Sequence, residues 1–192
     1  KFIIGLCLVP VGAGLTRSLI AWMRPLEAQT SSPVFLGFFI GFGLWVALYI
    51  FLPRPARSYV LAHEMTHAVW ATWFGARVVG MKVGREEGHV LLTNTNFLIT
   101  LAPYFFPFYT FITLLVYGVV SLGWNQDAFS PFWYGLIGLT LAYHLTFTFS
   151  ALHAGQDDLR EHGFVFSLPV IYIGNLLVLS AGILLIARPG WE

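Results

Sequence analysis

One short motif, HEMTH at residues 63–67, contains the residue types of a metal site. Residues four apart in a helix differ by only about 40° around its axis, so His63 and His67 face the same side and can bind one Zn²⁺ through their ring nitrogens. Glu64, next to the first histidine, can reach a metal-bound water and act as its general base. The spacing therefore predicts a zinc centre with two histidine ligands and a catalytic glutamate, rather than a structural His–Glu pair.

The third ligand must come from elsewhere in the chain, because a catalytic zinc ion usually has three protein ligands and a water. The best acidic candidates are Asp157 and Asp158, in the charged segment 156–163. Asp127, in a short predicted loop, is a further candidate that we expect to be exposed. Cys7 is the single cysteine, which excludes a thiolate zinc site and an internal disulfide. The residues alone leave Asp157 and Asp158 as alternatives, beside the interpretation of a solvated charged loop.

The segments that must position these residues are strongly apolar. Hydrophobic residues make up 57% of the 192 and charged residues only 10%, with a mean hydropathy of +0.75, whereas about a quarter of the residues in soluble domains are charged. The net charge of +1 excludes nucleic-acid binding driven by bulk electrostatics. Six apolar runs are long enough to cross a bilayer: residues 2–20, 34–52, 57–74, 97–122, 131–152 and 164–187. We therefore predict an all-α polytopic membrane protein with about six transmembrane helices. The first helix should be retained, because no small-x-small cleavage site follows it.

The segment 75–94 does not have the pattern of a helix. Two runs rich in valine and leucine flank the sequence GREEG at 84–88. A five-residue turn with two glycines between such runs predicts a β-hairpin. The hairpin directly follows the run that contains HEMTH, so we expect it to be associated with the membrane.

Six complete spans would separate the expected ligands. Asp158 follows the run 131–152 in the sequence. If 57–74 crosses the bilayer fully, the histidines lie near the face where that run enters, and Asp158 lies at the opposite face. Either the loop 153–163 folds inward, or the hairpin re-enters so that 57–74 crosses only in part. Non-helical backbone at membrane depth is tolerated where protein or a water-filled cavity surrounds it.

A few other polar residues have two interpretations each. His144, in the middle of an apolar run, either helps the site by holding a ligand or stabilising an oxyanion, or is a hydrogen-bonded packing residue. Asn94 either contacts a substrate backbone or caps the hairpin. Asn175 is expected to make an interhelical hydrogen bond, and Pro103 and Pro107 to bend the fourth helix.

Taken together, these features resemble the site-2 protease family of intramembrane zinc metalloproteases. The resemblance covers roughly residues 57–165 and rests on HEMTH in an apolar helix, the hairpin after it, and an acidic residue two apolar segments later. The chain is most similar to compact bacterial members, through LAPYFFP at 101–107 and a stretch running from Gln156 and Asp158 through Gly163 to Phe166 and Ser167. It lacks the Asn-Pro…Asp-Gly signature of better-known members and a PDZ domain.

The resemblance implies an organisation and an activity. It implies a single membrane domain over 1–192, with two additional helices in 1–56, a metalloprotease core in 57–165 and a C-terminal helix in 166–192. Asp158 is implied as the third zinc ligand, with Asp157 as the alternative. The expected protein is a multi-pass protein of the bacterial cell membrane. We expect it to cleave transmembrane protein substrates, held in extended form by a hairpin edge at 77–83 or 89–94. The competing expectation is a non-proteolytic membrane subunit with a structural or inactive zinc site.

Overall fold

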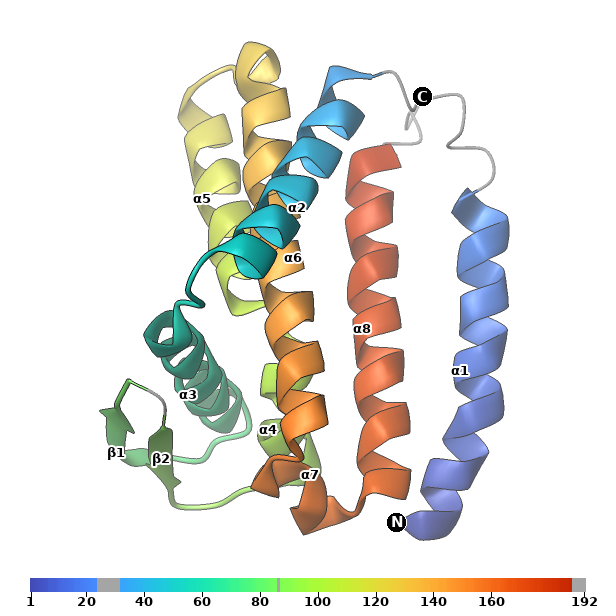
Figure 1. Cartoon of the computed structure of the whole chain (residues 1–192), viewed down its shortest axis with the longest axis vertical. Coiled ribbons are helices and arrows are strands. Elements are labelled where there is room, and N and C mark those ends of the chain that lie inside the picture. The colour runs from blue at the N-terminus through green and yellow to red at the C-terminus, as the bar shows by residue number, and fades with distance from the viewer. Residues whose placement is uncertain (24–31, 86, 188–192) are drawn as a thin grey trace.

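The structure is a computed structural model that describes residues 1–23, 32–85 and 87–187, and it is a helical bundle with one small hairpin (Figure 1). The elements are α1 (Phe2–Met23), α2 (Pro33–Phe51), α3 (Ala56–Trp73), β1 (Val78–Val83), β2 (Gly88–Leu92), α4 (Phe97–Leu101), the 3₁₀ turn η2 (Ala102–Tyr104), α5 (Phe108–Gly123), the 3₁₀ turn η3 (Asp127–Phe129), α6 (Ser130–Ala154), α7 (Asp157–His162) and α8 (Phe164–Ala187). The predicted class, a largely helical membrane-type protein with a hairpin after the HEMTH helix, is confirmed.

Four of these helices, α1, α2, α6 and α8, are long and apolar enough to cross a membrane. A fifth crossing results if α4 with η2 and α5 are counted as one bent span. Helix α3, which contains HEMTH, is not among these candidates. The predicted count of six spans therefore stays a prediction, and α3 is the helix on which it depends.

Close helix packing in the bundle depends on glycines. Helix α2 packs along α6 and α1 packs along α8. Gly41 of α2 lies against the backbone carbonyl of Gly135 in α6, and Gly138 of α6 lies against the carbonyl of Phe38. A side chain at these positions would collide with the facing backbone, so only glycine lets the two helices approach this closely.

The fourth apolar run is broken into two helices at an angle of 80°. Pro103 and Pro107 flank the break, and a proline has no backbone N–H to continue the hydrogen-bonding pattern of a helix. The predicted bend is therefore confirmed, and it is sharp enough to separate α4 and η2 from α5. Asn96 caps α4 by accepting hydrogen bonds from the backbone N–H groups of Leu98 and Ile99.

Helix α3, the hairpin, α4 and α7 gather at one end of the molecule (Figure 1). Strands β1 and β2 pair antiparallel, with Met81 opposite Val90 and an irregularity between Val78 and Gly80. Helix α7 lies in the connection between α6 and α8, at the same end. Six complete spans would have placed the histidines and Asp158 at opposite faces of the membrane. In the structure the HEMTH helix and the Asp157–Asp158 pair lie at the same end of the bundle.

Candidate metal centre

Helix α3 presents the two histidines and the glutamate of HEMTH to the interior of the protein. His63, Glu64 and His67 are all buried, and the rings of His63 and His67 lie 4.8 Å apart between centroids. Thr66, on the same helix, is also buried, and its hydroxyl donates a hydrogen bond to the backbone carbonyl of Ala62. A buried polar cluster of this kind is costly unless its members are paired or hold a metal.

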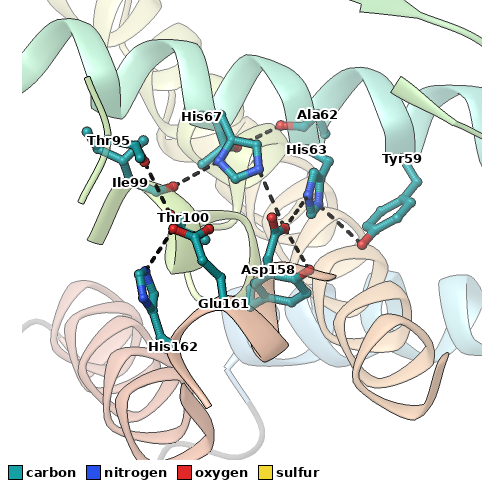
Figure 2. A network of polar contacts seen from close by, with 12 residues as sticks. Tyr59, Ala62, His63, His67, Thr95, Ile99, Thr100, Asp158, Glu161 and His162 are labelled. Carbon is teal, nitrogen blue, oxygen red and sulfur yellow. Dashed lines mark hydrogen bonds and ion pairs between the residues drawn. The ribbon is translucent and has the colours of Figure 1, made fainter. Parts of the chain in front are cut away.

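The two histidines converge on Asp158, as Figure 2 shows. The Nε2 atom of His63 lies 3.2 Å from Oδ2 of Asp158, and Nε2 of His67 lies 3.7 Å from the same oxygen. One ligand atom from each of the three residues fits within 4.8 Å of the others. Two donors about 2.0–2.1 Å from a tetrahedral zinc ion are separated by about 3.3 Å. The two histidine–carboxylate distances lie close to that value, so this donor set fits Zn²⁺.

Further groups hold the three side chains in this orientation. His67 donates its Nδ1–H to the backbone carbonyl of Ile99 at 2.8 Å, which leaves Nε2 directed at Asp158. Nδ1 of His63 lies 3.4 Å from the hydroxyl of Tyr59, and the hydroxyl of Tyr104 donates to Oδ2 of Asp158 at 2.9 Å. Partners of this kind fix the tautomer and orientation of metal-binding side chains.

Of the two neighbouring aspartates, the structure brings Asp158 to the histidines. Asp157, the alternative, is exposed and is not part of the three-residue group. Asp127, the further candidate, begins η3 at the opposite end of α6 from α7. Burial acts to raise the pKa of Asp158, but its interactions with His63 and His67 outweigh that effect and hold the pKa well below its usual range. The carboxyl is therefore charged near neutral pH.

Glu64 lies beside the start of β2. A Cβ atom on Gly88 would lie 2.8 Å from Cγ and 3.0 Å from Oε1 of Glu64, so the strand backbone passes directly over this side chain. Burial is the main cause that raises the pKa of Glu64; the charge of His67 acts to lower it, and the charge of Asp158 acts to raise it further. A carboxylate with a raised pKa is a stronger base, which suits proton transfer near neutral pH.

The candidate metal centre lies in a cleft of about 900 Å³. Side chains of α3, the strand β2 with the loop after it, and the end of α6 with α7 line the cleft. Its lining includes Glu64 and the three candidate ligands, together with Asn94 on the loop after β2. The cleft is large enough for a short extended peptide segment, and it borders one edge of the hairpin.

The two other residues singled out in the sequence lie in different places. Asn94 lines the cleft, where its side-chain oxygen accepts a hydrogen bond from the backbone N–H of Thr95. His144 is buried and contacts none of the candidate ligands; its Nε2 lies 3.3 Å from Oδ1 of Asn175, and with His63 it lines a separate cavity of about 20 Å³. The expected interhelical hydrogen bond of Asn175 is thus present, and the functional roles of Asn94 and His144 stay predictions.

Tyr104, Tyr59 and Gly88 also contact the candidate centre, and none of them has a residue type that predicts a metal ligand or a base. Tyr104 belongs to the LAPYFFP motif, and that motif was the one signal that pointed to it. Tyr59 lies four residues before His63, on the same helix face, which is a signal that helical spacing could have supplied. Gly88 has no such signal, because its role depends on the tertiary packing of β2 on α3.

No protein-family model, curated protein or solved structure matches the chain.

Proposed function

We propose that the chain is an intramembrane zinc metalloprotease. The observation that carries the proposal is the convergence of His63, His67 and Asp158 on one point inside a cleft, with Glu64 beside them. In the described part of the chain, the group has three protein donors. That number is typical of catalytic zinc sites, which keep a position open, whereas structural sites are closed by a fourth protein ligand. This favours a protease over a scaffold with a structural metal.

The proposed reaction assigns a role to each residue. His63, His67 and Asp158 would hold the zinc ion, which supplies a Lewis acid for the peptide carbonyl and lowers the pKa of water. Glu64 accepts a proton from the attacking water and later delivers it to the leaving amine. A structural metal site has no use for a base at this position, so the presence of Glu64 supports hydrolysis.

A transmembrane substrate must be unwound before water can attack its backbone, because helical carbonyls are shielded. Within the described residues β2 pairs only with β1, so its other edge is free. Residues 88–90 and 92–95 line the cleft. Of the two edges considered from the sequence, this favours 89–94 over 77–83 as the one that holds an extended substrate by strand addition.

The decisive experiment separates the base from the ligands. Glu64→Gln should bind zinc like the parent but lose turnover by about 10²- to 10⁴-fold, because glutamine keeps the shape and cannot accept the proton. Glu161→Gln is the matched control: it neutralises an exposed carboxylate in the lining of the same cleft that is not part of the three-residue group, so cleavage should continue. His67→Ala should empty the metal site.

The assay is co-expression with a set of single-span membrane proteins, together with metal analysis of the purified protein. A shortened product should appear with the parent and with Glu161→Gln, and not with Glu64→Gln. Identical fragments from parent and Glu64→Gln would contradict the catalytic role of Glu64. Bound zinc without cleavage of any substrate would favour the scaffold instead.

A further inference from the structure

The LAPYFFP motif places a tyrosine against the candidate metal centre. Tyr104, in η2, is fully buried and touches two of the three candidate ligands. Its hydroxyl donates to Oδ2 of Asp158 at 2.9 Å, and its ring lies edge-on to the ring of His63 at 5.4 Å. The oxygen that accepts from Tyr104 is the same oxygen on which the two histidines converge.

The short helix that carries Asp158 is anchored beside that residue, where Leu159 is fully buried and its carbonyl accepts a hydrogen bond from the hydroxyl of Ser167. Helix α7 has only six residues, and its N-cap, Gln156, makes no side-chain capping bond. Gly155 and Gly163, at its two ends, both have positive φ, a backbone conformation that glycine adopts readily. Besides the two histidines, the Tyr104 hydroxyl is the described side-chain group that contacts the Asp158 carboxylate, so its hydrogen bond helps to fix the direction of this side chain.

Two neighbouring residues of α8, Gly174 and Asn175, contact the backbone or side chains of Tyr104 and Phe105. Asn175 of α8 donates from Nδ2 to the backbone carbonyl of Tyr104 at 2.8 Å, and its Oδ1 lies 3.3 Å from Nε2 of His144 in α6. Next to it, Gly174 leaves room for Phe105, whose Cγ would be 2.6 Å from a Cβ at that position. Helix α8 thus packs against the proline-flanked break at Tyr104 and Phe105.

We propose that Tyr104 is the positioning residue of the metal centre, and that Asn175, oriented by His144, sets its place. The hydroxyl holds Asp158 in the geometry that receives the metal, and the amide holds the backbone from which the tyrosine extends. This inference rests on the metal-binding part of the proposed function and not on proteolysis. Loss of an outer hydrogen-bonding partner typically costs about 10- to 100-fold in metal affinity.

The test measures zinc affinity of the full chain in detergent, by competition with a chromophoric chelator. Tyr104→Phe should weaken zinc binding about 10- to 100-fold. The matched control is Tyr143→Phe, which removes the hydroxyl of another buried tyrosine; that hydroxyl hydrogen-bonds Ser58 and is not among the groups that contact Asp158. The control should bind zinc like the parent, and circular dichroism should show the same helix content in both variants.

A double variant tests the connection to α8. Asn175→Leu should also weaken zinc binding, and Tyr104→Phe combined with Asn175→Leu should lose no more than Tyr104→Phe alone, because both act through one contact. Losses that multiply would overturn the role of Asn175, and unchanged affinity in Tyr104→Phe would overturn the proposal. If Tyr104→Phe does not fold, the test rests on Asn175→Leu, and an unchanged zinc affinity in that variant would overturn the proposal. A parent that binds no zinc overturns this proposal and the proposed function together, whereas zinc binding without cleavage contradicts proteolysis alone.

Discussion

Replacing Gly88 by alanine should disable the proposed enzyme while leaving its candidate ligands untouched. A Cβ atom at Gly88 would lie 2.6 Å from Cγ1 of Val60 and 2.8 Å from Cγ of Glu64. Carbon atoms in ordinary contact are about 3.5–4.0 Å apart, so β2 and Glu64 must separate by about 1 Å. A displacement of about 1 Å between reacting groups can cost about 100-fold in rate, and overpacking of this size costs about 1–3 kcal/mol of stability.

The matched control for this change is Gly80→Ala in the facing strand. A Cβ atom at Gly80 would lie 3.7 Å from Cδ1 of Leu91, an ordinary contact. Neither glycine is among those with positive φ, so alanine fits the backbone at both positions. Gly80→Ala should therefore keep both turnover and stability.

The assay compares the initial cleavage rate of one single-span substrate by parent, Gly88→Ala and Gly80→Ala, with zinc content and thermal unfolding measured on the same samples. We expect Gly88→Ala to keep its zinc, to unfold at a lower temperature and to cleave about 100-fold more slowly. Cleavage by Gly88→Ala at the parent rate would refute the reasoning that β2 is fitted against Glu64, the proposed catalytic base.

Two further predictions concern the ligand and the bundle. Asp158→Asn should weaken zinc binding much more than Asp157→Asn, because only Asp158 meets the histidines; chelator competition measures both, and the reverse order would contradict the assignment. Gly41→Leu should unfold at a lower temperature than the parent, because Gly41 lies against the carbonyl of Gly135, whereas Gly43→Leu should be tolerated because Gly43 has open space around it. Equal melting temperatures for the two leucine variants would contradict the close α2–α6 packing.

Much of the secondary structure could be predicted from hydropathy. The run predicted at 164–187 coincides with α8, and the run at 131–152 lies within α6. Both runs end at charged segments, which a membrane helix cannot easily include, so composition alone places the helix ends. The sequence also predicts the hairpin, because two β-prone runs enclose a turn with two glycines.

The sequence does not predict in the same way whether α3 crosses the bundle or stays near its end. Its run has the length of a span, but α3 is not among the helices apolar enough to be candidate spans. Length alone does not show whether such a helix crosses the bundle or stays near its end. The choice between Asp157 and Asp158 has the same cause on a smaller scale. Successive residues of a helix point about 100° apart, so the orientation of α7 against α3 decides which carboxylate faces the histidines.

The place of the candidate centre in the fold also bears on how water reaches it. Asp158 lies on the connection between α6 and α8, where one candidate span ends and the next begins, and α3 brings its histidines to the same end. A centre at mid-span would need a separate channel through apolar side chains to supply the water that hydrolysis consumes. The cleft here is lined by histidines, carboxylates, threonines and an asparagine, which can hydrogen-bond water. The position of Glu64 and the three candidate ligands at the end of the bundle is therefore compatible with the proposed water-consuming reaction in an otherwise apolar chain.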